Sequence, residues 1–338
     1  MNSSASRAKR NSSQLLGWFV LVLPPLFWAG NFVVGRAACD DVPPIMLAFA
    51  RHFVALAFLL PFGWAAMRRD IKRYWECRWQ LVATSLAGMV AFNVLVYLGL
   101  HSTTASIGQL LNSTIPVLIV LLNAVFLKQR LSVTQVFGLV LSCTGVLIIV
   151  LHGEFARLVA LQFSAGDLLV FAAMASFALF TILLRSLPVD IDRLGLLGAQ
   201  LVLAVVVLFP LLLWEHIDGA RANWNTSALA AMLYVGVAAS LLANLLYMFG
   251  IARVGPARAG MFIHLVPLYG AIISVALLGE RLQAYHAVGL AAIMAGLACF
   301  NMAEKYGSRR PQVNQNQKHV GHPATALIQR LRNRAPRT

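Results

Sequence analysis

Two stretches of the sequence decide the fold: residues 93–116, NVLVYLGLHSTTASIGQLLNSTIP, and residues 244–267, NLLYMFGIARVGPARAGMFIHLVP. They align without a gap when the chain is shifted by 151 positions, and the match continues as far as residue 145. The matched pairs include Asn93 with Asn244, Gly99 with Gly250, Pro116 with Pro267, Arg130 with Arg281, Gly138 with Gly289 and Gly145 with Gly296. Apolar sequence supplies chance matches between leucines, but not Asn, Gly, Pro and Arg in one register. The chain therefore contains an internal repeat.

The earlier part of each unit aligns at a shift of 149, which places Trp28 on Phe177 and Pro61 on Pro210. We therefore expect one repeat over residues 15–151 and a second over residues 152–303. A basic N-terminal segment (residues 1–14) and a basic, apolar-poor tail (residues 304–338) flank them. The composition of the tail is typical of disorder.

Composition places these repeats in a membrane. The 338 residues are 59% hydrophobic and only 12% charged, with a mean hydropathy of +0.75. A helix needs about 20 apolar residues to cross a bilayer, and helices satisfy their own backbone hydrogen bonds there. Ten segments meet this need: 17–36, 45–66, 79–100, 103–127, 132–151, 168–184, 194–214, 227–250, 255–278 and 285–303.

The sequence therefore predicts an all-α integral membrane protein with ten transmembrane helices arranged as two five-helix repeats. Because five is odd, the second repeat enters the membrane inverted relative to the first. Inverted repeats are typical of secondary transporters, whose substrates bind near the midplane between the repeats.

The distribution of charge indicates the orientation. With the N-terminus inside, 22 of the 27 Lys and Arg residues fall on the inner side. Cytoplasmic loops carry this excess of positive charge, so both termini are expected in the cytoplasm. The net charge of +15 is then explained by topology, and no nucleic-acid partner is expected.

Candidate substrate-binding residues cluster beside two prolines in the middle of spans, Pro116 and Pro267. A proline inside a helix removes a backbone hydrogen bond, and interrupted spans at matching positions indicate a transport site. The alternative is that each proline only bends a packed helix. The polar side chains beside these breaks are Gln109, Asn112 and His264.

Further candidates lie at the depth expected for a cavity. Trp28 and Asn31 fall in the first span, and Phe177 is the repeat equivalent of Trp28. Asn93 and Asn244 occupy equivalent depths, with Tyr97 near the first of them. Buried amides can also join helices by hydrogen bonds, so both roles remain open for these two asparagines.

Two further features are expected to be structural. Arg51 lies inside a span, about two turns from its outer end, where it can extend to the lipid headgroups. Gly138, Gly145, Gly289 and Gly296 give two helices small-residue faces, suited to close packing within the fold or to a homodimer contact. The four cysteines share no plausible neighbourhood, so neither a disulfide nor a metal site is expected.

No catalytic, nucleotide-binding or metal-binding motif is present in the sequence, and no acid, base and nucleophile converge at one depth. We therefore expect no enzyme activity and no cofactor. A membrane-embedded enzyme and a receptor or scaffold are the alternatives to a transporter. Proton-driven carriers commonly use titratable side chains inside the membrane as a relay, and His264 is the one such side chain expected at mid-depth. Facilitated diffusion is therefore preferred, with proton exchange through His264 as the alternative.

The ten-span pattern, the string Trp-Ala-Gly-Asn-Phe at 28–32 and the sequence Gly-Glu-Arg-Leu at 279–282 together resemble the EamA-type members of the drug/metabolite transporter superfamily. The resemblance covers residues 15–303 and departs at Lys128-Gln129-Arg130, where the family usually has a glutamate. It implies a bacterial inner-membrane exporter or facilitator of amino acids or similar metabolites. Its aromatic amino-acid exporters are the closest analogy.

Overall fold

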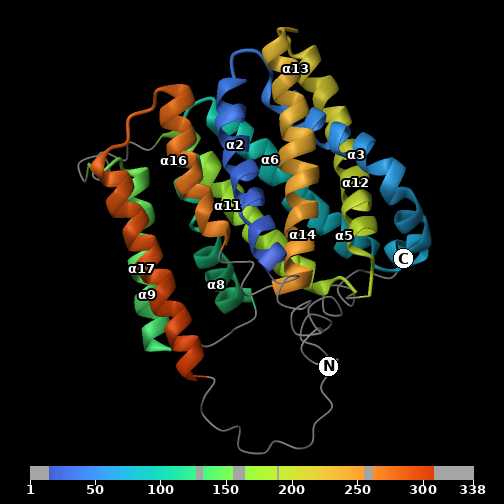
Figure 1. Cartoon of the computed structure of the whole chain (residues 1–338). Coiled ribbons are helices and arrows are strands. Elements are labelled where there is room, and N and C mark those ends of the chain that lie inside the picture. Colours follow the sequence, from blue (N-terminus) through green and yellow to red (C-terminus); the bar gives the residue numbers. More distant parts are fainter. Residues whose placement is uncertain (1–14, 127–131, 155–163, 189, 255–261, 308–338) are drawn as a thin grey trace, which may run out of the picture.

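The computed structural model describes residues 15–126, 132–154, 164–188, 190–254 and 262–307. Within these ranges every regular element is a helix (Figure 1). They are α2 (Leu23–Ala37), α3 (Pro44–Arg69), α4 (Ile71–Glu76), α5 (Arg78–Ser85), η1 (Leu86–Ala91), α6 (Phe92–Leu100), α7 (Ala105–Asn112), α8 (Ile115–Phe126), α9 (Val133–Val150), α11 (Ala165–Leu183), η2 (Leu184–Ser186), α12 (Arg193–Ile217), α13 (Thr226–Leu233), η3 (Tyr234–Leu242), α14 (Ala243–Val254), η4 (Phe262–His264), α16 (Leu265–Leu278) and α17 (Ala284–Gly307).

Six helices are long and apolar enough to cross a membrane: Leu15–Ala37, Pro44–Arg69, Arg78–Leu100, Ala165–Ser186, Arg193–Ile217 and Thr226–Gly250. The bent pair α7 and α8 makes a seventh if it is one span. Shorter apolar helices occupy the segments predicted as the fifth, ninth and tenth spans. The protein is therefore all-helical and multi-pass within the described residues, and the count of ten spans stays a prediction.

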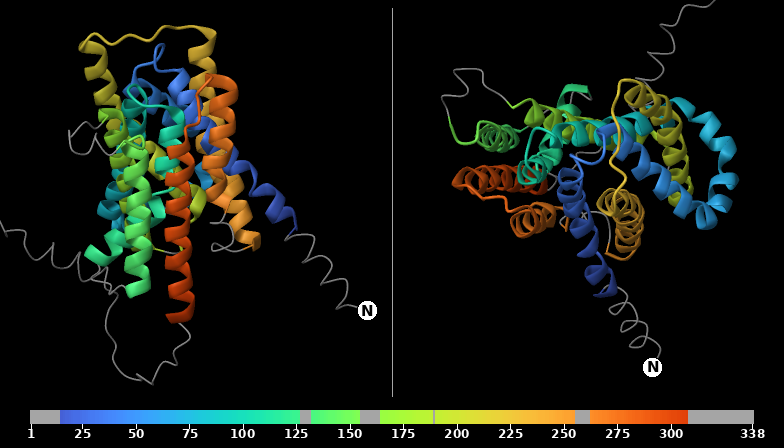
Figure 2. Two further views of the ribbon diagram at one scale, coloured as in Figure 1. Left: turned by 90° about the vertical axis from the view of Figure 1, so that its left-hand side faces the viewer. Right: turned by 90° about the horizontal axis from the view of Figure 1, so that it is seen from above.

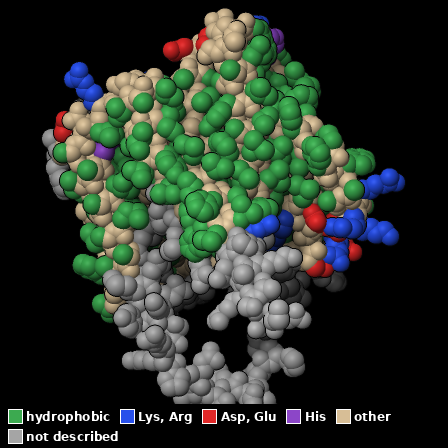
Figure 3. Space-filling view, viewed as in Figure 1, with side chains coloured by type: hydrophobic (Ala, Val, Ile, Leu, Met, Phe, Trp, Pro, Cys, Tyr) green, Lys and Arg blue, Asp and Glu red, His purple; other side chains and the backbone are tan. Residues whose placement is uncertain are grey.

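The surface fits a lipid environment. Hydrophobic side chains cover the middle of the visible face, and charged side chains gather toward its two ends (Figure 3). Large apolar residues are widely exposed, among them Phe62 (80%) and Val206 (62%). Soluble proteins rarely expose so much contiguous apolar surface.

Local sequence determines where these helices begin. The Thr104 hydroxyl accepts a hydrogen bond from the backbone N–H of Ile107 and caps α7, and Ser132 caps α9 together with Gln135 in a capping box. Between α7 and α8 the chain bends by 45°. Pro116 is the second residue of α8, where its missing N–H costs no helical hydrogen bond. The span is therefore interrupted just before Pro116, and the gating role of this proline stays a prediction.

Helices α9 and α17 form an antiparallel pair beside the main bundle (Figures 1 and 2). A Cβ at Gly145 would lie 2.6 Å from the carbonyl oxygen of Gly289, and one at Gly296 would lie 2.4 Å from that of Gly138. The predicted small-residue faces therefore pack against each other within the chain.

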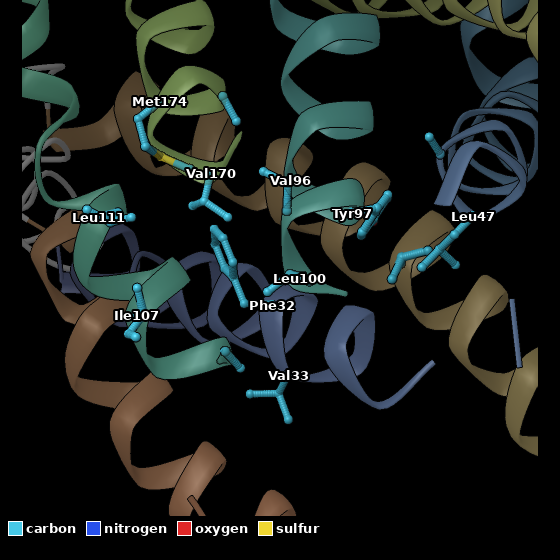
Figure 4. Close-up of a cluster of buried hydrophobic side chains, with 14 of the residues drawn as sticks. Phe32, Val33, Leu47, Val96, Tyr97, Leu100, Ile107, Leu111, Val170 and Met174 are labelled. Atoms are coloured by element: carbon cyan, nitrogen blue, oxygen red, sulfur yellow. The ribbon is translucent and has the colours of Figure 1, made fainter. Parts of the chain in front are cut away.

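The main bundle has one large apolar core (Figure 4). Helices α2, α3, α6, α7 and α11 all contribute to it, so both predicted repeats meet there. Tyr97, which is 1% exposed, belongs to this core and lies near Leu100 (Figure 4). Its hydroxyl reaches the polar cluster described next.

Candidate substrate site

A polar cluster is buried between α2, α3 and α6. The Arg51 Nη1 atom donates to Asn31 Oδ1 at 2.6 Å and to the Tyr97 hydroxyl at 3.1 Å. That hydroxyl in turn donates to Asn31 Oδ1 at 2.9 Å. The three side chains are between 1% and 8% exposed. Two predicted site residues, Asn31 and Tyr97, therefore meet in one closed triangle with a positive charge.

The expectation that Arg51 extends to the lipid headgroups is wrong. Arg51 is 8% exposed and points into the bundle, because it shares a helix face with the buried Ala48 and Ala55. The signal was present in the sequence as the spacing of small and apolar residues along residues 44–69. Arg51 is thus a functional candidate in its own right, as charged groups inside membranes generally are.

His52 is a buried residue that the sequence analysis did not single out. It is 1% exposed, and its Nδ1 lies 2.6 Å from the Ala48 carbonyl oxygen, so this nitrogen carries the proton. Its Nε2 then faces the Asn93 amide nitrogen at 3.5 Å. His264 is therefore not the single titratable group inside the spans. The His264 side chain lies outside the described part of the structure.

Asn93 and Asn244 have the same local role. Each follows a π-helical segment, η1 or η3, and donates its amide hydrogen to the carbonyl four residues back. The acceptors are Met89, at 2.7 Å, and Ser240, at 2.6 Å. A π-segment widens one turn of a helix, and such segments are frequent at functional sites. Each asparagine thus stabilises an irregular turn inside a span.

Two of the predicted aromatic residues, Trp28 and Phe177, are only partly buried and lie in separate groups. The Trp28 ring meets Tyr247 edge-on, with ring centroids 5.3 Å apart. Phe177 packs between Phe92 and Phe180, with centroids at 5.1 and 5.4 Å. Trp28 and Asn31 are three residues apart on α2 and share one face of that helix.

The broken span α7–α8 contributes the remaining predicted residues. Gln109 is 1% exposed and fills the space beside Gly270, with its amide nitrogen 3.4 Å from the Ser274 hydroxyl. Asn112 is the last residue of α7 and is half-buried. Gln109 therefore contacts α16, and its role as a substrate ligand stays a prediction, as does that of Asn112.

Two carboxylates each hold the start of one helix, at the upper end of the bundle (Figure 1). Glu215 accepts hydrogen bonds from the backbone N–H groups of Ile45 and Met46 at 2.9 and 2.8 Å. Glu280 accepts from those of Ala105 and Ser106 at 2.8 and 3.0 Å. Free N–H groups at a helix start favour such negative charge. The 279–282 motif thereby acquires a local function: it anchors the start of α7.

The described residues thus form a multi-pass helical bundle with a charged and polar cluster inside its apolar core. The model of the EamA-like transporter family matches residues 15–151 and again residues 164–302. The chain belongs to this family.

Named relatives agree with this assignment. An uncharacterised transporter of Archaeoglobus fulgidus is 25% identical over 279 residues, covering 82% of this chain and 94% of the relative. A protein of Streptantibioticus cattleyicolor named "probable terminal-alkyne amino-acid exporter" is 26% identical over 284 residues, covering 84% and 92%. A solved crystal structure at 16% identity matches with a TM-score of 0.54, over 87% of this chain and 99% of the other, and this likeness concerns the fold alone.

Proposed function

We propose that this membrane transporter is a secondary carrier, an exporter or facilitator of amino acids or related small metabolites. It works by alternating access to a site between two inverted five-helix repeats. The observation that carries the proposal is the Arg51–Asn31–Tyr97 cluster, since a buried guanidinium in an apolar core needs a functional reason. The relative named as an amino-acid exporter supports the solute class.

The packing of α9 on α17 supports the inverted repeats. Under the 151-residue shift, Gly145 is equivalent to Gly296 and Gly138 to Gly289. The contacts Gly145–Gly289 and Gly296–Gly138 are therefore the same contact seen from each repeat. Such self-complementary pairing is the mark of a two-fold axis. The Ser142 hydroxyl donates to the carbonyl of Ile293, its own repeat equivalent, at 3.2 Å, as expected beside that axis.

The π-helical segments add independent support. Residues 86–91 fall on residues 237–242 under the same shift, and these form η1 and the last part of η3. The asparagine that follows each segment makes the same hydrogen bond in both halves. Irregular turns at matching depths are suited to a site that both repeats enclose.

Polar contacts that join the predicted repeats at the two ends of the bundle support alternating access. At the upper end Asp41 accepts hydrogen bonds from the side chains of Asn223 and Asn225, both at 2.9 Å. At the lower end Arg69 pairs with Asp192 at 2.9 Å. Exposed polar contacts contribute little stability each, so these contacts can separate at small energetic cost. The Glu215 and Glu280 hydrogen bonds also join the repeats at the upper end and hold that end more firmly.

Localisation in a bacterial inner membrane with cytoplasmic termini belongs to the same proposal. Native cysteines are poor probes of it, because burial raises the pKa of Cys39 to about 11 and that of Cys77 above its usual range. A thiol reacts as the thiolate, so both label slowly at neutral pH. Exposed positions serve better. Asp40→Cys in a cysteine-free background should label with an impermeant reagent in intact cells, and Glu76→Cys should not; the reverse pattern rejects the orientation.

The proposed function is tested by counterflow. The full-length protein in liposomes loaded with one unlabelled solute should accumulate the same labelled solute transiently, across a panel of amino acids and metabolites. Empty liposomes and Asp218→Asn, at an exposed carboxylate beyond α12, are the controls. A folded protein that exchanges none of the panel contradicts the proposal and favours a receptor or scaffold.

A further inference from the structure

We infer that Arg51 and Asn31 bind the carboxylate of the transported solute, and that the protein recognises small organic acids by this group without reading an amino group by charge. The inference rests on the proposed function, because it names the chemistry of the same site. Four features of the structure lead to it.

The first feature is the set of hydrogen-bond donors left unused. Arg51 has five N–H donors, and only those on Nη1 are engaged, by Asn31 and Tyr97. The Nε and Nη2 atoms donate to no described residue. Asn31 Oδ1 is occupied by two donors, whereas its Nδ2 has no acceptor among the described residues. The unused groups of Arg51 and Asn31 are all hydrogen-bond donors, so the complementary ligand must supply acceptors.

The second feature is the shape of the free donor set. The Nε–H and one Nη2–H bond lie in the guanidinium plane along one of its edges and point in parallel. This fork matches the two oxygens of a carboxylate, which is the usual reason why arginine rather than lysine occupies such sites. The bonds on Nη1 fix the plane, so the fork is oriented before a solute arrives.

The third feature is the missing counterion. The ion pairs among the described residues join Arg69 to Asp70 and Asp192, Arg73 to Asp190, and His152 to Asp167. No described carboxylate pairs with Arg51, which is 8% exposed. A buried charge without a partner is costly, and an anionic solute removes that cost when it binds.

The fourth feature is the neighbouring surface. Trp28 lies one turn from Asn31 on the same face of α2, and its ring contacts Tyr247 at 5.3 Å. A solute whose carboxylate meets Arg51 can therefore rest its apolar part on this aromatic pair. No described carboxylate adjoins the cluster to pair with an ammonium group. An acid without an amino group should therefore bind about as well as the amino acid.

The test is direct binding to the full-length protein in lipid nanodiscs. Labelled 3-phenylpropanoate is competed with L-phenylalanine, L-phenylalaninamide and phenethylamine, which differ only in their charged groups. We expect both carboxylates to bind and the amide and the amine to compete at least tenfold more weakly. Arg51→Met should weaken carboxylate binding about tenfold to hundredfold, as expected for loss of a charged hydrogen-bond pair. Arg51→Lys should give an intermediate loss, because it keeps the charge and lacks the fork.

Arg36→Met is the matched control, since Arg36 donates to the Leu100 carbonyl at 2.6 Å near the upper end of the bundle and should leave affinity unchanged. If Arg51→Met does not fold, the solute series on the wild type and on Arg51→Lys still decides. Amine and amide binding equal to that of the acids overturns the inference, and so does unchanged affinity in Arg51→Met. Absence of carboxylate binding overturns it too, while counterflow of a cation or neutral solute would leave the proposed transport function standing.

Discussion

Replacing Glu215 or Glu280 by glutamine tests whether carboxylates hold the starts of α3 and α7. Each carboxylate accepts two backbone N–H groups at 2.8 to 3.0 Å. Glutamine keeps one oxygen for one of these groups, and it turns an NH2 group toward the other. The substitution therefore removes one charged hydrogen bond, leaves one N–H without a partner, and weakens attraction to the helix dipole.

The two sites differ in burial, and this sets the magnitudes. Glu215 is 9% exposed, so its hydrogen bonds lose little to solvent, and Glu215→Gln should cost about 2–3 kcal/mol. Glu280 is half-buried, and we expect about 1–2 kcal/mol for Glu280→Gln after allowance for solvent screening. Glu76 is exposed at the end of α4, and Glu76→Gln is the matched control with no expected change.

The assay is the apparent thermal midpoint of the purified protein in one detergent, measured for all three variants. At about 2–4 °C per kcal/mol, Glu215→Gln should lower the midpoint by about 4–12 °C and Glu280→Gln by about half as much. Glu280→Gln should in addition make α7 more accessible to proteolysis near residue 105. The reasoning from burial is wrong if both variants have the same thermal midpoint as Glu76→Gln. It is also wrong if Glu280→Gln lowers the midpoint more than Glu215→Gln does.

The other predictions concern packing, the π-segments and pH. Gly145→Val should cost about 1–3 kcal/mol by forcing α9 from α17, whereas Cys143→Val on the exposed face should melt like the wild type. Asn93→Ala and Asn244→Ala should each lower stability by about 1 kcal/mol, and a loss in only one of them would contradict their equivalence. Hydrogen bonds from the backbone N–H groups of Gly195 and Leu194 and from Arg69 lower the pKa of Asp192 from its ordinary 3.8. Asparagine can also cap a helix, so the stability that wild type holds over Asp192→Asn at neutral pH is only that of the carboxylate charge, about 0.5–1 kcal/mol, and it should disappear as the pH falls through the lowered pKa. A difference that persists in acid would reject the assignment.

The sequence analysis predicted the helical membrane class and the interruption at Pro116 because both depend on local composition. A long apolar run favours a membrane helix, and a proline interrupts a helix, whatever the rest of the fold is. It also placed Asn31 and Tyr97 among the site residues, and the structure brings these two together. Their meeting point required knowledge of which helix faces which, and a shift of one residue along a helix turns a side chain by about 100°.

Arg51 shows the same limit most clearly. Depth along a span suggested an arginine that extends to the headgroups, whereas rotation about the helix axis decides where the side chain goes. The buried stripe of Ala48, Arg51 and Ala55 recorded that rotation in the sequence. His52 and the π-segments were missed for another reason. A π-segment has no strong local sequence signal, because it arises where the packing of a whole span requires one more residue in a turn.

Alternating access requires that the site beside Arg51 opens to each side of the membrane in turn. It is tested most directly by Trp28→Cys in a background without native cysteines, reconstituted in one orientation and exposed to an impermeant thiol reagent from one side or the other. Alternating access predicts that position 28 labels from both sides, and that saturating 3-phenylpropanoate slows labelling from each. Labelling from one side only, with or without solute, would contradict alternating access.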